Sequence, residues 1–146
     1  MRPLIVDLGR EYRGGQHQAL LLAQGLVARG HAAQLLTLGG SLLAGRASGS
    51  DVTVHNVSER SRRLGAARMI RSLLRSRAID IVHANEPHAL TAAWLARAHR
   101  VIPVVVSRRV IYPLSRSSIS QARYRTAARI IAVSQFVADA TGLPQN

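Results

Sequence analysis

Residues 3–29, PLIVDLGREYRGGQHQALLLAQGLVAR, decide the fold, because an apolar run is followed by a glycine pair and a long helical pattern. This order predicts a strand, a turn at Gly14 and Gly15, and a helix that continues to Val27. We expect glycine there because a tight turn uses backbone angles that a Cβ would resist, and because a bare backbone lets a ligand approach. The free N–H groups of the first helical turn favour a phosphate. The alternative is a turn that only connects two packed elements.

The length and composition indicate one globular domain, and the chain has no thiol group. The chain has 146 residues, 47% of them hydrophobic, and it contains no cysteine. Disulfides, thiol catalysis and cysteine metal sites are therefore excluded. The sequence has no signal-peptide pattern, and no apolar stretch approaches the ~20 residues that a membrane-spanning helix needs. We expect a cytoplasmic protein that is soluble or peripheral on the inner face of the membrane.

The net charge is the extreme feature of this sequence. Twenty basic residues, all arginine, stand against seven acidic ones and give a formal charge of +13. Such a charge attracts phosphate, nucleic acid or an anionic membrane surface. Only 3% of the residues are aromatic, which counts against single-stranded nucleic acid, because its bases usually stack on rings. Nucleic acid is therefore the least favoured of these partners.

Strands and helices alternate along the rest of the chain. Apolar runs predict strands at 33–38, 52–57, 79–83, 101–107 and 129–133, and helical patterns occur at 61–77, 89–100, 121–127 and 134–140. We expect 52–57 at an edge of the sheet, 101–107 near its centre, and 108–120 as a basic loop. This alternation predicts an α/β fold, a Rossmann-like, doubly wound parallel sheet of about six strands, in a single domain over 1–146.

The helix predicted for 61–77 is basic and amphipathic. Its apolar residues share one side, whereas Arg68, Arg71 and Arg75 share the other at spacings of three and four. A solvated outer face is the ordinary explanation of this pattern. Docking on anionic lipid is the functional alternative.

Ligands of such sheets bind at the carboxyl ends of the strands, near the switch point between the first and fourth strands. This rule selects a candidate site from the following segments: 9–17, 83–88, 107–112 and 134.

The segment 83–88 concentrates polar groups where the fourth strand meets its helix. It contains His83, Asn85, Glu86 and His88. Each histidine is either a packed structural residue or a functional group, and Glu86 before Pro87 can cap the helix with its carboxylate. The two histidines have no third ligand at a suitable spacing, so no metal site is expected.

Two arginines come directly after the fifth predicted strand. Guanidiniums such as those of Arg108 and Arg109 can bind phosphate or carboxylate in a bidentate way, and solvated loop charges are the alternative. The chain shows no catalytic triad order, no paired-carboxylate spacing and no Walker loop. It therefore lacks a self-contained catalytic constellation.

With these residues in place, the sequence resembles the amino-terminal domain of GT-B glycosyltransferases of the family 4 type. The resemblance spans essentially the whole chain as an ordered set of short motifs. The matching pieces are Gly14-Gly15-Gln16, Leu26-Val27-Ala28-Arg29-Gly30-His31, Asp80-Ile81-Val82-His83-Ala84-Asn85-Glu86-Pro87 and Ile130-Ile131-Ala132-Val133-Ser134.

The resemblance implies the acceptor-binding half of a retaining transferase, which moves a sugar from a nucleotide-sugar to a glycan, lipid or small-molecule acceptor without a cofactor. It implies that Gly14, Gly15 and Gln16 approach the donor diphosphate. The implied acceptor side comprises His83, Asn85, Glu86, Arg108 and Arg109, of which His83, Glu86 and Arg108 are the catalytic candidates.

Two departures from the family pattern bear on these expectations. Many relatives carry a histidine just after the fifth strand, whereas this chain has Ser107-Arg108-Arg109. The second Rossmann-like domain, which holds the nucleotide-sugar and a glutamate pair in such enzymes, is absent from these 146 residues. We therefore expect a truncated or split half with little or no activity alone. A non-catalytic nucleotide- or phosphate-binding Rossmann module that regulates a partner is the alternative.

Overall fold

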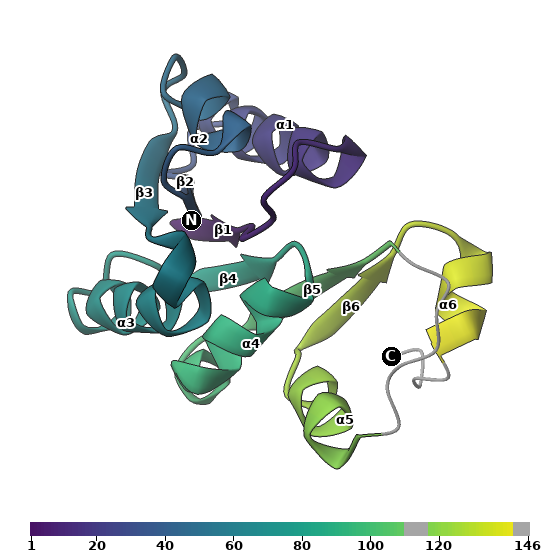
Figure 1. The fold of residues 1–146 in the computed structure, drawn as a ribbon. Helices are drawn as coiled ribbons and strands as arrows, with labels where there is room; N and C mark the ends of the chain where they lie inside the picture. The colour runs from purple at the N-terminus through teal and green to yellow at the C-terminus, as the bar shows by residue number, and fades with distance from the viewer. Residues whose placement is uncertain (110–116, 142–146) are drawn as a thin grey trace.

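The computed structural model describes residues 1–109 and 117–141, and it contains a six-stranded parallel sheet (Figure 1). The strand order is β3-β2-β1-β4-β5-β6, so the chain reverses its direction of growth between β1 and β4. The predicted doubly wound fold is therefore confirmed. The strands are β1 (Pro3–Val6), β2 (Gln34–Leu38), β3 (Thr53–Val57), β4 (Ile81–Ala84), β5 (Val104–Arg108) and β6 (Arg129–Ala132).

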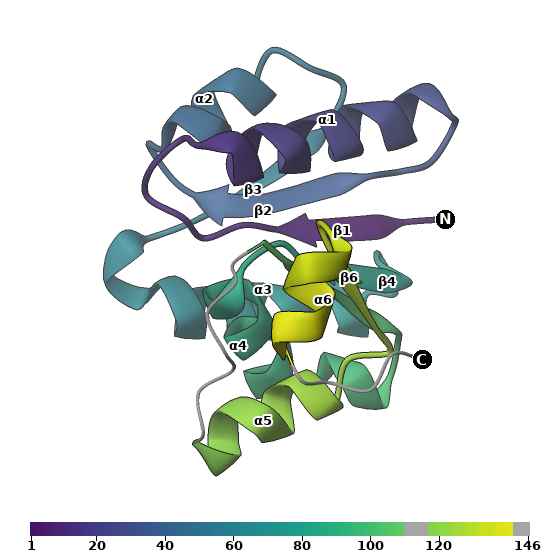
Figure 2. The same ribbon diagram turned by 90° about the vertical axis from the view of Figure 1, so that its right-hand side faces the viewer.

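Helices cover both faces of this sheet, and Figure 2 shows the layers from the side. On one face, α1 and α2 pack on Ile5 and Leu35; on the other, α3, α4 and Tyr124 of α5 pack on Leu4, Val82 and Val106. Alternate residues of each strand serve opposite cores, as a pleated strand requires. The helices are α1 (Gly14–Ala28), α2 (Leu42–Ala47), α3 (Arg62–Arg75), α4 (Pro87–Leu95), α5 (Ser118–Arg125) and α6 (Gln135–Thr141), with 3₁₀ turns η1 (Glu59–Ser61) and η2 (Ala98–Arg100).

Three details of the sequence-based prediction for β5 and α4 are wrong. The run 101–107 forms β5 only from Val104, and β5 is the fifth strand in the order rather than a central one. β1 and β4 occupy the centre of the sheet although they have fewer β-branched residues than β5. The composition of a strand therefore did not predict its position in the sheet. The helix expected at 89–100 ends at Leu95, because Arg97 adopts a left-handed conformation (φ 57°) and the 3₁₀ turn η2 follows.

The end of α1 confirms the expected glycine stop. Gly30 has φ 78°, its N–H donates to Val27 O, and the N–H of His31 donates to Leu26 O. These are the two bonds of a Schellman motif, in which glycine adopts the left-handed angles without a Cβ penalty. The stop turns the chain directly into β2. Among the described residues, no helix is long and apolar enough to cross a bilayer.

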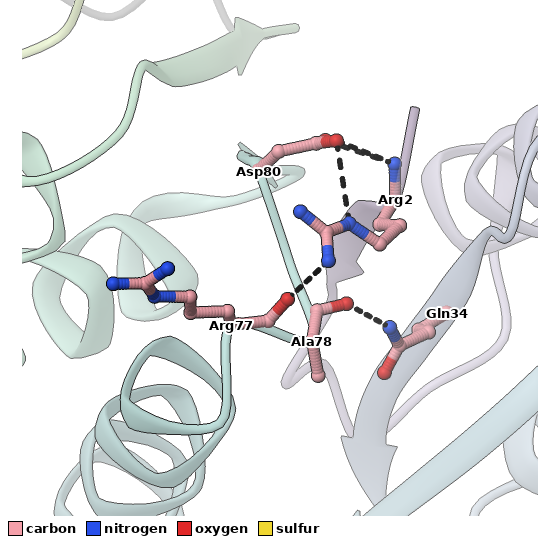
Figure 3. A network of polar contacts seen from close by, with 5 residues as sticks. All are labelled: Arg2, Gln34, Arg77, Ala78 and Asp80. Carbon is pink, nitrogen blue, oxygen red and sulfur yellow. Dashed lines mark hydrogen bonds and ion pairs between the residues drawn. The ribbon is translucent and has the colours of Figure 1, made fainter.

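A polar network joins the turn before β4 to β1 and β2 at the amino ends of the strands (Figure 3). The Asp80 carboxylate accepts the backbone N–H of Arg2 at 2.9 and 3.0 Å, and the Arg2 guanidinium donates to Arg77 O. Gln34 Nε2 donates to Ala78 O at 2.8 Å. The network lies at the edge opposite the carboxyl ends, so its role is to hold the strands together.

Candidate functional site

A pocket of about 230 Å³ opens at the carboxyl ends of β1, β4 and β5, at the switch point of the sheet. Ligands of doubly wound sheets bind in this position. Most of the predicted site residues line it, and they come from three segments far apart in the sequence. The lining residues are Asp7, Arg13, Gly15, Gln16, Asn85, Glu86, Pro87, Ser107, Arg108, Arg109 and Tyr124.

A buried hydrogen-bond network connects the three elements that surround the pocket. Asp7, which is 0% exposed, accepts from Asn85 Nδ2 at 2.5 Å and from Gln16 Nε2 at 3.0 Å. Asn85 Nδ2 also donates to Gly15 O at 3.0 Å, and Asn85 Oδ1 accepts from Arg109 Nη1 at 2.6 Å. One amide therefore links β1, α1 and the end of β5, and the network fixes the first turn of α1 against β4.

The glycine pair does not form a turn of its own. Gly14 and Gly15 are already the first residues of α1, and neither has a positive φ, so the expectation of turn angles that a Cβ would resist is wrong. An added Cβ would meet nothing within 4 Å at Gly14 and would lie 3.4 Å from Arg109 Nη1 at Gly15. The second expected reason for glycine, an open approach to the backbone, is compatible with this geometry.

The first turn of α1 presents unused backbone donors beside the pocket. Within the part of the chain that the structure describes, the N–H groups of Gly14 and Gly15 have no acceptor, whereas the N–H of Gln16 takes part in a capping box with Arg13. The N–H of Arg13 instead donates to Gln16 Oε1 at 3.1 Å. Free N–H groups at a helix amino end, together with the helix dipole, favour an anion.

Glu86 lines the pocket and also caps α4. Its carboxylate accepts the N–H groups of His88 at 2.6 Å, Ala89 at 2.7 Å and Leu8 at 3.3 Å. The helix-capping role inferred from Pro87 is therefore confirmed, and the cap also holds the loop after β1. Burial raises the pKa of Glu86 above its ordinary value, whereas the accepted N–H bonds act in the opposite direction.

His83 lies behind the pocket rather than in its lining. It is within β4, paired in register with Ile5 and Val105, and its Nε2 lies 2.7 Å from Ser107 Oγ. Burial, with a smaller effect of the Arg109 charge, lowers the pKa of His83 to about 4. The imidazole is therefore neutral near pH 7, and among the described residues Ser107 connects it to the pocket lining.

Arg108 and Arg109 contact different elements instead of forming one fork. Arg108 is the last residue of β5 and is buried; its Nη1 donates to the Tyr124 hydroxyl at 3.2 Å and its guanidinium lies 5.6 Å from the ring centre. Arg109 turns toward α1, where its Nε donates to Gln18 Oε1 at 3.1 Å. Successive side chains near a strand end point to opposite faces, which separates the two. Residues 110–112 of the predicted site lie outside the described residues.

Sequence reasoning missed Asp7 and Tyr124. Asp7 is a lone carboxylate in the apolar run that forms β1, and that isolation was the available signal, because a charge is rarely buried without partners. Tyr124 offered no such signal, since a tyrosine in a helical pattern is usually a core residue. In the described residues, no group of three or more histidine and acidic side chains could hold a metal ion.

The six parallel strands and the pocket at their switch point define a Rossmann-like ligand-binding domain, of the kind that forms one half of a GT-B architecture. The model of Glycosyltransferase Family 4 matches residues 12–142, and the chain therefore belongs to this family. Comparison with curated proteins gives no match.

Solved structures share the fold at low sequence identity. A glycosyltransferase from Rickettsia africae is 20% identical, with a TM-score of 0.76 over 94% of this chain and 38% of that one. Anabaena HepE in complex with UDP and glucose is 20% identical (TM-score 0.67; 96% and 40%), and Acinetobacter baumannii MurG is 14% identical (0.67; 89% and 40%). The chain thus spans about 40% of the length of these proteins.

Proposed function

We propose that this chain is the acceptor-binding half of a retaining glycosyltransferase, which transfers a sugar from a nucleotide-sugar to a glycan, lipid or small-molecule acceptor. The observation that supports it is the pocket at the switch point of a family 4 domain. At about 230 Å³, this pocket is smaller than the ~300–1,000 Å³ of ordinary ligand sites, which fits one wall of a cleft that a second domain completes.

Gly14, Gly15 and Gln16 are proposed to contact the donor diphosphate, because the unused N–H groups of Gly14 and Gly15 are backbone donors at a helix amino end and Gln16 follows them in the same turn. HepE has been solved in complex with UDP-glucose, which supports a nucleotide-sugar as the donor class. Most of the donor contacts would come from the second domain, and no cofactor is proposed.

On the acceptor side, Arg109 is the proposed direct contact, because its side chain is partly exposed and lines the pocket. Asn85 is a positioning residue that holds it, and Glu86 and Arg108 form the wall. Arg108 and Glu86 remain proposed catalytic candidates, whereas His83 can act only through Ser107.

Sugar transfer by the isolated chain tests this proposal. We expect little or no turnover with UDP- or GDP-sugars, because half of the cleft and most of the donor contacts are missing. Robust turnover by the 146 residues alone would overturn it. A clear rise in the melting temperature of the chain with a free nucleotide-sugar, but no sugar transfer, would instead support the alternative of a regulatory nucleotide-binding module.

We also propose a peripheral contact with the cytoplasmic face of an anionic membrane through α3. Arg68, Arg71 and Arg75 are exposed on this helix, although Arg71 Nη2 also donates to Leu95 O at 2.6 Å and so helps to end α4. We expect retention on vesicles containing anionic lipid, and we expect Arg68→Ala/Arg75→Ala to weaken it roughly 30-fold, since each surface arginine contributes about 1 kcal/mol. Equal retention on neutral and anionic vesicles would contradict the contact.

A further inference from the structure

Four cationic or imidazole side chains gather beside the pocket, and we call them the arginine cluster: Arg62, Arg63, His88 and Arg123. Arg62 and Arg63 begin α3, His88 is the second residue of α4, and Arg123 belongs to α5. Burial, with smaller effects of the Arg62, Arg63 and Arg123 charges, lowers the pKa of His88. Arg123 Nη1 also donates to Thr91 Oγ1 at 2.6 Å. Thr91 lies three residues after His88 and therefore on the same face of α4.

The cluster lacks compensating negative charge. Across residues 1–109 and 117–141, no carboxylate forms an ion pair with Arg62, Arg63 or Arg123. Glu59, the acidic residue nearest to α3 in the chain, pairs with Arg10 instead. The carboxylate of Glu86 accepts three backbone N–H groups. The guanidinium charges therefore remain available to an external anion.

The position of these charges opposes the local preference of a helix. The amino end of a helix carries a partial positive charge, so cations are disfavoured there and acidic residues are preferred. α3 nevertheless begins with two arginines and has no acidic residue in its first turn. An anion bound between the helices would supply the missing charge.

The arginine cluster borders the pocket on two elements. Glu86 and Pro87 line the pocket and His88 follows them; Tyr124 lines it and Arg123 precedes that residue. Figures 1 and 2 show α3, α4 and α5 on the same face of the sheet. Because helices that follow parallel strands begin at the carboxyl edge, Arg62, Arg63 and His88 lie at the edge that carries the pocket. Arg123 is in the last turn of α5, and it joins this group through its bond to Thr91 and its neighbour Tyr124 in the pocket lining.

We propose that Arg62, Arg63, His88 and Arg123 form a subsite for the phosphate or diphosphate group of a phosphorylated acceptor, with Arg123 held in place by Thr91. This inference rests on the proposed function, because it makes the occupant of the neighbouring pocket an acceptor. Guanidiniums bind phosphate through paired, charge-assisted hydrogen bonds, and three of them can surround one such group. The anionic group would come from an isoprenoid diphosphate or from a soluble sugar phosphate.

The test is a titration of the ¹⁵N-labelled 146-residue chain with inorganic pyrophosphate at 150 mM salt, followed through the amide signals of residues 62, 63, 88 and 123. We expect Arg62→Ala/Arg63→Ala to weaken binding at these amides at least tenfold. The matched control, Arg68→Ala/Arg75→Ala, removes the same charge from the same helix, and we expect less than a twofold change because salt screens distant surface charges over about 8 Å.

Equal weakening in both double variants would show a general charge effect and overturn the subsite, as would binding that Arg62→Ala/Arg63→Ala leaves unchanged. Arg62→Lys/Arg63→Lys, whose charge is intact, should lose part of the affinity because lysine lacks the planar fork. Urea unfolding of each variant verifies that it is folded.

Two further ligands distinguish the sources of the phosphate. Tighter binding of geranyl diphosphate than of pyrophosphate assigns a lipid-linked acceptor, and tighter binding of glucose 1-phosphate assigns a soluble one; either supports the subsite. Pyrophosphate binding requires neither donor nor transfer. Its failure would therefore refute the subsite alone, whereas robust sugar transfer by the isolated chain would refute the proposed function alone.

Discussion

Asp7→Ala is expected to lower the free energy of unfolding by about 3 kcal/mol, the largest effect of a single side chain near the pocket. The wild-type carboxylate is fully buried and accepts from Gly9 N, Gln16 Nε2 and Asn85 Nδ2. Its removal leaves these donors without that partner in a buried site, and each unsatisfied group costs about 1–3 kcal/mol. Urea unfolding at pH 7 measures the change.

Gln16→Ala is the matched control, because it removes one donor group to the same carboxylate, together with the acceptor of the Arg13 N–H, and leaves Asn85 in place. We expect a loss of about 1 kcal/mol for this variant. A loss below about 1 kcal/mol for Asp7→Ala would contradict the role assigned to the network. In that case the Asp7 carboxylate would not be needed to hold the first turn of α1 to β4.

His83 is expected to make stability depend on pH between 6.5 and about 4. The folded pKa is lowered from 6.5 to about 4, so the unfolded chain takes up a proton at a higher pH than the folded protein does. The contribution to stability is therefore fully present above pH 6.5 and is lost as the pH falls toward about 4. The full shift corresponds to about 3 kcal/mol.

Urea unfolding of the wild type and His83→Gln at pH 7, 5 and 4 measures this contribution. We expect the wild type to lose about 3 kcal/mol more than the variant over this range. Ser107→Ala is the control: it keeps the imidazole, and the pH dependence should persist because burial, not the hydroxyl, is the main cause of the lowered pKa. Parallel profiles for wild type and His83→Gln would show that His83 is not buried as described.

The fold could be predicted because its signals are local and repeated. Apolar runs alternate with helical patterns, Gly30 ends α1, and Pro87 begins α4 directly after Glu86. Each of these depends on a backbone preference that one residue imposes on its neighbours. The position of β5 could not be predicted in the same way, because strand order depends on packing between elements that are distant in the sequence.

The site was predicted as a region but not in its contacts. The rule about carboxyl ends brought Gly15, Asn85, Glu86 and Arg109 to one pocket. The bonds of these residues could not be predicted, because they join positions far apart in the sequence, from 24 residues for Arg109 to Asn85 to 78 residues for Asn85 to Asp7. Arg108 and Arg109 contact helices on opposite faces of the sheet, and this depends on where β5 ends. Strand boundaries are weakly marked in sequence, so these contacts could not be predicted.

The most direct measurement of the central claim is a titration of the ¹⁵N-labelled chain with UDP-glucose. We predict binding weaker than about 1 mM, with amide shifts concentrated at Gly14, Gly15 and Gln16, because this half carries only a few of the donor contacts. Micromolar binding would show an autonomous nucleotide module. Shifts centred on Arg2 and Asp80, at the other edge of the sheet, would show that the pocket is not the ligand site.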